Sequence, residues 1–102
     1  MINIPTHRIP THPGEMLLKE FLEPLAITQE ELAEKLYISS EEIKELVKGT
    51  QGMKPRLALR LAKFWGMSPE FWLNLQLRWD IYHIEQLEAS DLAKIHPYSE
   101  RV

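Results

Sequence analysis

The side chains best suited to recognise another molecule lie in the segment Ser39–Gly49, which reads SSEEIKELVKG. On a helical wheel the apolar residues Ile43, Leu46 and Val47 gather on one side. The other side carries a fan of hydroxyl-bearing and charged side chains: Ser40, Glu41, Lys44, Glu45 and Lys48. Such groups form hydrogen bonds to base edges and phosphates, and they do not pair a nucleophile with a base. The segment therefore predicts recognition rather than catalysis.

Three carboxylates make this segment unusual for a surface that would meet a polyanion. A glutamate can accept a hydrogen bond from cytosine N4, but acids beside phosphates forgo the counterion release that drives binding. Glu42 follows Ser39 at the spacing of a capping box, so its side chain is expected to turn toward the start of its own helix. Two further pairs have the spacing of ion pairs, Glu41 with Lys44 and Glu45 with Lys48. A solvated salt-bridge surface without a ligand is the alternative interpretation.

A second capped helix precedes this segment and completes a two-helix motif over about residues 28–48. Thr28 and Glu31 have capping-box spacing, and a short connection separates the two helices. Small Ala33 in the first helix and Ile43 in the second are typical of a helix-turn-helix, in which the second helix enters a DNA groove. Gln29, at the start of the first helix, would then contact a phosphate.

Basic residues around the loop GTQGM extend the predicted DNA surface. Gly49 and Gly52 allow a close approach of the backbone to a phosphate. Arg60 and Lys63 lie further along the next helix and are expected to face solvent or partners within the chain. The predicted DNA-binding residues are Gln29, Ser39, Ser40, Glu41, Lys44, Glu45, Lys48, Lys54 and Arg56.

The elements that must position these side chains are all helices. Residues 1–13 contain three prolines and predict an extended arm. Five helices are expected: one from Gly14 that stops at Pro24, two in the motif, one over 55–65 and one over about 68–88. The predicted domains are the arm (1–13), a five-helix, all-α helix-turn-helix domain (14–88) and a C-terminal extension (89–102).

Composition bounds the class of protein. With 102 residues, 44% apolar residues, a net charge of −3 and no cysteine, the chain predicts one small cytoplasmic domain. The charge is uneven, because residues 28–48 hold six acids and three bases whereas 54–82 hold five bases and two acids. Any DNA surface must therefore be local. No segment suggests a membrane span.

The fifth helix is expected to make a homodimer, because it is apolar on two faces. One face carries Phe71, Leu75, Trp79 and Tyr82. The second face carries the predicted interface residues Leu73, Leu77, Ile81 and Ile84, although which of the two faces meets a copy of the chain stays open on sequence alone. Such a two-fold dimer separates two recognition helices by about 34 Å, one turn of DNA. In the alternative, the C-terminal extension folds back over this second face.

Signals for chemistry are weak. The histidines His7, His12, His83 and His96 are scattered without metal-ligand spacing. No metal, cofactor or small-molecule substrate is predicted, and the chain is not expected to be an enzyme. His12 and Glu15 are better explained as residues at the start of the first helix.

Two long strings resemble a known family. The strings HPGEMLLKEFLEPLAITQEELAEKL and MKPRLALRLAKFWGMSPEFWLNLQ are similar to those of HigA-type antitoxins of the Xre, or lambda-repressor-like, helix-turn-helix class. The resemblance covers about residues 10–80. It implies a small bacterial homodimer that binds and neutralises a toxin, typically an mRNA endonuclease. It also implies that the protein represses its own operon by binding an operator.

Two positions depart from that family pattern. Tyr37 stands at the turn where Xre proteins commonly have glycine, so either the turn is rearranged, or Tyr37 packs over the helix pair, or it adopts a strained left-handed conformation. The other departure is the acidic recognition helix. Two alternatives stay open on this evidence: a helix-turn-helix fold used only to bind proteins, and a stand-alone transcription regulator.

Overall fold

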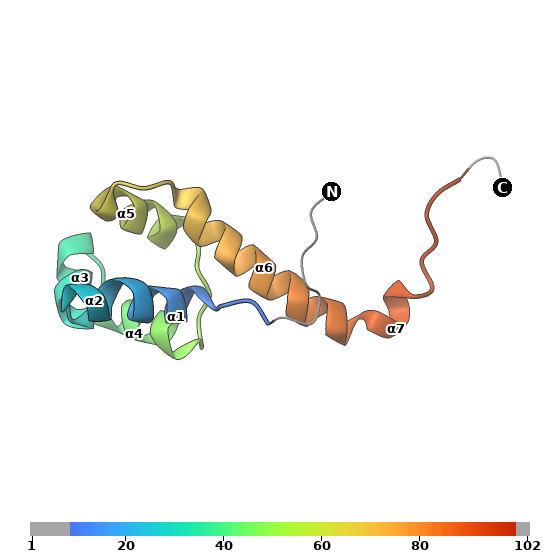
Figure 1. Cartoon of the computed structure of the whole chain (residues 1–102), viewed down its shortest axis with the longest axis horizontal. Coiled ribbons are helices and arrows are strands. Elements are labelled where there is room, and N and C mark those ends of the chain that lie inside the picture. Colours follow the sequence, from blue (N-terminus) through green and yellow to red (C-terminus); the bar gives the residue numbers. More distant parts are fainter. Residues whose placement is uncertain (1–8, 100–102) are drawn as a thin grey trace.

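The computed structural model describes residues 9–99, and within them every regular element is a helix. Figure 1 shows a compact group of short helices from which one long helix projects. The expectation of an all-α fold is confirmed. The helices are α1 (Pro13–Leu17), η1 (Leu18–Leu22), α2 (Glu23–Leu25), α3 (Gln29–Leu36), α4 (Ser40–Lys48), α5 (Pro55–Trp65), α6 (Pro69–Leu87) and α7 (Ala89–Leu92).

The first three of these elements form one continuous helix with a π-helical middle. The helix begins at Pro13, one residue earlier than expected, and the His12 ring nitrogen Nδ1 accepts a hydrogen bond from the Gly14 N–H (2.9 Å). The helix ends at Leu25, one residue beyond the predicted stop at Pro24. The chain leaves the helical conformation at Ala26, which is left-handed (φ 55°).

Local capping accounts for most of the remaining helix boundaries. The predicted capping box at α3 is present: the Thr28 hydroxyl accepts from the Glu31 N–H (3.0 Å), and the Glu31 carboxylate accepts from the Thr28 N–H (2.9 Å). Pro55 opens α5, and Gly66 ends it in a left-handed conformation (φ 62°). Each of these boundaries therefore follows from residues within the same turn.

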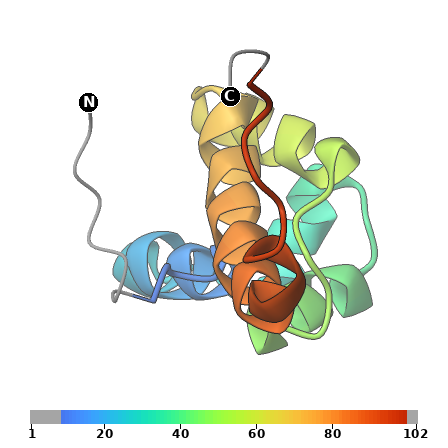
Figure 2. The same cartoon turned by 90° about the vertical axis from the view of Figure 1, so that its right-hand side faces the viewer.

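The C-terminal part differs from the expected plain extension. After α6 ends at Leu87, a further short helix, α7, covers Ala89–Leu92. Residues 93–99 then run away from the bundle, and the described chain does not fold back over α6 (Figure 1). In Figure 2 α6 (orange) lies in front of the group of short helices, which includes the first helix (blue) and the α3–α4 pair (cyan to green).

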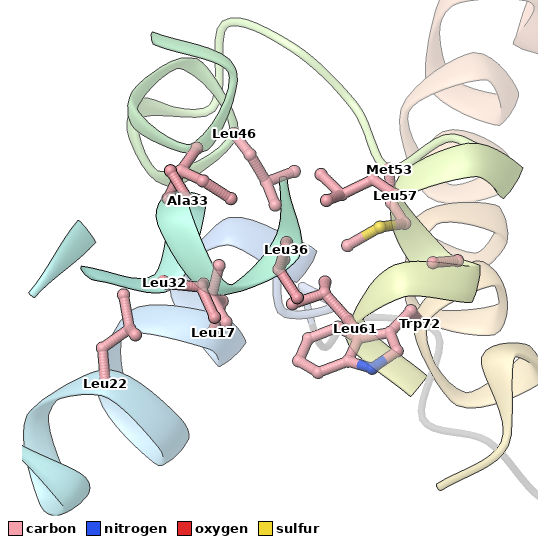
Figure 3. Packing of buried hydrophobic residues seen from close by; sticks show 12 residues of the cluster. Leu17, Leu22, Leu32, Ala33, Leu36, Leu46, Met53, Leu57, Leu61 and Trp72 are labelled. Atoms are coloured by element: carbon pink, nitrogen blue, oxygen red, sulfur yellow. The ribbon is translucent and has the colours of Figure 1, made fainter. Parts of the chain in front are cut away.

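The core lies where α1, α3, α4, α5 and the first turns of α6 meet. Figure 3 shows leucine side chains of α1, η1, α3, α4 and α5 gathered between these helices, with Trp72, the largest fully buried side chain, beside Leu61. Phe21 and Trp65 pack against the Trp72 ring, with ring centroids 5.0 Å and 6.4 Å from it. Leu25, the last residue of this first helix, is exposed. The core thus joins the base of α6 to the two-helix motif.

Candidate nucleic-acid interface

The turn between α3 and α4 has the geometry of a helix-turn-helix. Tyr37 is left-handed (φ 59°, ψ 45°), and its N–H donates to the carbonyls of Ala33 and Glu34. The Ile38 N–H also donates to the Ala33 carbonyl (3.0 Å), which completes a Schellman-type closure of α3. Of the three possibilities predicted for this turn, Tyr37 therefore adopts the strained left-handed conformation. Its side chain is 87% exposed and does not pack over the helix pair.

Packing from two sides holds α4 in place. Ala33 is buried against α4, and Ile43 and Leu46 are fully buried beneath it. On its other flank α4 meets α1 at Gly14, where a β-carbon would lie only 1.8 Å from the Leu46 carbonyl oxygen. No larger residue fits between these two helices without moving them. The orientation of α4 is thus set by backbone contact.

The outward face of α4 carries the predicted fan of polar side chains. Glu41 and Lys48 are exposed, whereas Ser40, Lys44 and Glu45 are half-buried at the edges of the face. The Ser39 hydroxyl caps the helix by accepting from the Glu42 N–H (3.2 Å). Gln29 lies half-buried at the start of α3, and together with Glu30, Lys44, Val47 and Lys48 it lines a shallow hollow beside α4. The structure therefore brings the N-terminus of α3 and the outer face of α4 together.

The charged residues of this face pair across helices and not along them. Lys44 Nζ lies 3.2 Å from Glu30 Oε2 on α3, and Arg56 Nη1 of α5 lies 2.6 Å from Glu42 Oε2. The expected pairs Glu41–Lys44 and Glu45–Lys48 are absent from the ion pairs among residues 9–99. Hydrogen bonding to its own backbone N–H, followed by Lys44, lowers the pKa of Glu30 below its ordinary value.

The predicted capping role of Glu42 is only half correct. Its backbone N–H is the one that Ser39 caps, but its carboxylate turns to Arg56 instead of back to the Ser39 N–H. A guanidinium offers a charged donor, which is a stronger partner for a carboxylate than a neutral amide. Arg56, expected to contact phosphate, is therefore engaged by an acid of the recognition helix.

The loop after α4 is held by a residue that sequence reasoning missed. Gln76 of α6 accepts from the Met53 N–H through Oε1 (2.6 Å) and donates to Asp80 Oδ1 through Nε2 (2.9 Å). Gly49 ends α4 with φ 83°, and Lys54 follows the loop as an exposed cation. No sequence signal marks Gln76, since it lies 23 residues from the amide that it anchors.

Comparison with known proteins agrees with this geometry. A helix-turn-helix family model matches residues 18–72. A protein named antitoxin HigA-1 from Vibrio cholerae is 42% identical over 87 residues, which cover 82% of this chain and 82% of that protein.

The chain belongs to the HigA-type, Xre-like helix-turn-helix family.

Two further matches describe the range of this family. A Haemophilus influenzae protein, named an uncharacterized HTH-type transcriptional regulator, is 39% identical over 88% of this chain and 86% of its own length. A solved structure of Pseudomonas aeruginosa antitoxin HigA with the higBA promoter superposes with a TM-score of 0.83 at 30% identity. That match covers 88% of this chain and 99% of the other. The resemblance inferred from the two strings is confirmed.

The HigA-type family consists of DNA-binding antitoxins and regulators and not of enzymes. Within residues 9–99 no histidine, aspartate and glutamate side chains gather in a group that could hold a metal ion. His12, the one buried polar residue of the core region, caps α1 and meets Trp79 edge-on at 4.9 Å between ring centroids. Burial chiefly lowers the pKa of His12, whereas Asp80 and Glu15 act to raise it.

The four residues expected at a dimer interface differ in burial: Leu73 is less exposed than the other three. Leu73 is half-buried and packs against the core of its own chain. Leu77, Ile81 and Ile84 are exposed by 55%, 49% and 52% along the projecting part of α6. Leu73 lies closer to the bundle than the other three, which explains the difference.

No helix in the described part of the chain is long and apolar enough to cross a membrane.

Proposed function

We propose that this chain is an antitoxin that binds operator DNA with α4 in the major groove, represses its own operon and neutralises a small RNase toxin. The observation that carries the proposal is the outer face of α4, held by α1 and α3 and continuous with Gln29 and the Lys48–Lys54 loop. The similarity to an antitoxin solved with a promoter, over nearly the whole chain, supports the same function. Operator binding also requires the protein to act in the cytoplasm.

The acidic character of α4 is compatible with this function because ion pairs match part of the negative charge on and beside this helix. Glu30 and Glu42 are paired with Lys44 and Arg56, so only Glu41 and Glu45 present unpaired carboxylates at the reading face within the described chain. One of them accepting from cytosine N4 would contribute to sequence choice. Phosphate contacts would then come from Gln29, Lys48 and Lys54, at the two edges of the face.

Fluorescence anisotropy with a duplex of the chain's own promoter tests operator binding. Glu45→Gln and Glu41→Gln distinguish reading from repulsion: a base-reading acid loses cognate affinity on neutralisation, whereas an acid that only repels phosphate gains affinity for every sequence. Glu20→Gln, an exposed acid of the first helix, is the matched control for net charge. Absence of binding at low salt, with and without the toxin, contradicts the operator-binding proposal.

The proposal includes a homodimer made by the projecting part of α6. A single copy leaves Leu77, Ile81 and Ile84 about half exposed to water on α6, the long helix that projects from the bundle in Figure 1, and pairing with a second copy would bury them around a two-fold axis. Ile81→Asp is expected to give a monomer in analytical ultracentrifugation and to weaken operator binding strongly. Leu25→Asp, at a similarly exposed leucine of the first helix, keeps the dimer. A dimer that survives Ile81→Asp would rule out this interface.

Similarity to proteins named as antitoxins supports a toxin as the partner of this chain. Similarity to proteins named as transcription regulators supports a second candidate function. Relatives such as the Haemophilus influenzae protein carry the name of transcription regulators, so a stand-alone regulator is the alternative. A small basic reading frame beside the gene, whose product arrests growth and co-purifies with this chain, supports the antitoxin. If no such neighbour exists but the promoter is bound, the regulator is the correct function.

A further inference from the structure

A shallow hollow of about 610 Å³ lies between the end of α3 and the outer side of α5, away from the predicted reading face of α4. Its α5 wall is one stripe at helical spacing, opposite the buried stripe of the same helix. The apolar side chains that line it and face solvent are Tyr37, Leu59 and Phe64. Exposed apolar groups gathered beside a polar rim are typical of surfaces that bind proteins.

The rim of this hollow is entirely cationic, although the chain as a whole carries a net charge of −3. Two of the cations are engaged: Arg60 Nη1 donates to the Leu36 carbonyl (2.7 Å), which ties α5 to the end of α3, and Arg56 pairs with Glu42. Lys35 and Lys63 have no ion pair among residues 9–99. The hollow therefore presents two available positive charges beside apolar side chains, and no lining residue is acidic.

Tyr37 adds an independent reason to expect an external contact here. Its left-handed backbone costs a non-glycine residue about 1–2 kcal/mol, and a glycine would adopt it freely. With 87% of its surface exposed, the side chain recovers little of that cost by packing within the chain. Backbone strain that no contact within the chain offsets points to a function for the Tyr37 side chain.

We propose that this hollow is a docking site for an acidic segment of a partner protein that carries apolar anchor residues. The anchors would lie against Tyr37, Leu59 and Phe64, and the partner's carboxylates would pair with Lys35 and Lys63. A nucleic acid fits less well, because phosphates placed against the leucine and phenylalanine side chains would lose hydration without gaining hydrogen bonds in return. The inference goes beyond the proposed function, since it needs neither operator DNA nor a particular toxin.

Titration of the ¹⁵N-labelled full chain with two synthetic peptides tests the proposal. Both are helix formers of about 16 residues with Leu and Phe at i, i+3 and i+7, and their polar positions are glutamate in one and lysine in the other. The acidic peptide is expected to shift the amides of Tyr37, Leu59 and Lys63 and to bind at least tenfold more tightly than the basic one. Equal binding of both peptides, or binding of neither, overturns the proposal.

Variants at exposed positions make the test specific to the hollow. Leu59→Ser and Lys63→Glu are each expected to weaken the acidic peptide about tenfold. Leu25→Ser, at a leucine of similar exposure (53% against 59%), and Lys19→Glu are matched controls that leave binding unchanged. Tighter binding of a duplex DNA to the same amides, insensitive to Leu59→Ser, would assign the site to nucleic acid instead. A loss of dimer on Leu59→Ser would assign it to a second copy of the chain; either result refutes the proposal.

Discussion

Gly14 is the point at which the first helix touches the recognition helix, and its replacement by alanine is expected to loosen both. An alanine β-carbon would lie 1.8 Å from the Leu46 carbonyl oxygen and 2.6 Å from the carbonyl carbon. The first distance is about 1.6 Å short of ordinary van der Waals contact. Because the contacted atoms are backbone within α4, no side-chain rotation can relieve the clash. The two helices must move apart.

The size of the effect follows from what that separation exposes. Leu17, Ile43 and Leu46 are fully buried at or near this contact, and overpacking of a core typically costs about 1–3 kcal/mol, sometimes more. In a helix without the clash, glycine to alanine would instead stabilise by about 0.5–1 kcal/mol. We expect Gly14→Ala to lower the free energy of unfolding by about 3 kcal/mol, the opposite sign to helix propensity.

Urea unfolding followed by far-UV circular dichroism measures this free energy, and operator affinity measured below the transition reports the position of α4. Gly66→Ala is the matched control, because its β-carbon meets nothing within 4 Å and the only cost is the left-handed backbone, about 1–2 kcal/mol. That variant should retain full operator affinity. A neutral or stabilising Gly14→Ala would refute the contact between α1 and α4 as the support of the recognition helix.

Three further outcomes are expected. Tyr37→Gly relieves the left-handed strain at an exposed position and should raise the free energy of unfolding by about 0.5–1 kcal/mol, net of the greater flexibility of glycine in the unfolded chain; a less stable variant would mean that the side chain packs within the chain. Because the pKa of His12 is lowered in the folded chain, the unfolded chain takes up a proton at a higher pH than the folded chain does. The contribution of His12 to the free energy of unfolding is therefore fully present above about pH 6.5 and falls below that pH by up to about 1.4 kcal/mol per pH unit. His12→Asn, which can still cap the helix, should lose that part of the pH dependence, and identical pH profiles for the two proteins would contradict it. Gln76→Ala leaves the Met53 N–H without its acceptor and should cost about 1–3 kcal/mol. Faster hydrogen exchange at Met53 and weaker operator binding would accompany it, whereas unchanged exchange would show that the loop does not depend on this bond.

Sequence by itself determined the features that depend on neighbours within one or two turns. The all-α class, the capping box of Thr28 and Glu31 and the buried stripes of α3 and α4 were all predictable. A left-handed Tyr37 at the end of α3 was one of the three conformations that the sequence predicted for this turn. Caps and periodic stripes involve residues three or four apart, so the amino-acid order contains both partners.

Only the tertiary structure decided which groups far apart in the chain meet. Lys44 and Arg56 were expected to be free or paired locally, and instead they bind Glu30 and Glu42 across helices. The anchoring of the loop by Gln76 and the close approach at Gly14 have no local signal either, since each joins residues more than 20 positions apart. Such contacts depend on how the helices cross once their apolar faces are buried, because burial energy has no direction and many crossings satisfy the same stripes. For the acids of the recognition helix, sequence explained Glu42 as a cap and paired Glu41 and Glu45 with nearby lysines, whereas packing pairs Glu42 with Arg56 and leaves Glu41 and Glu45 without an ion pair among residues 9–99.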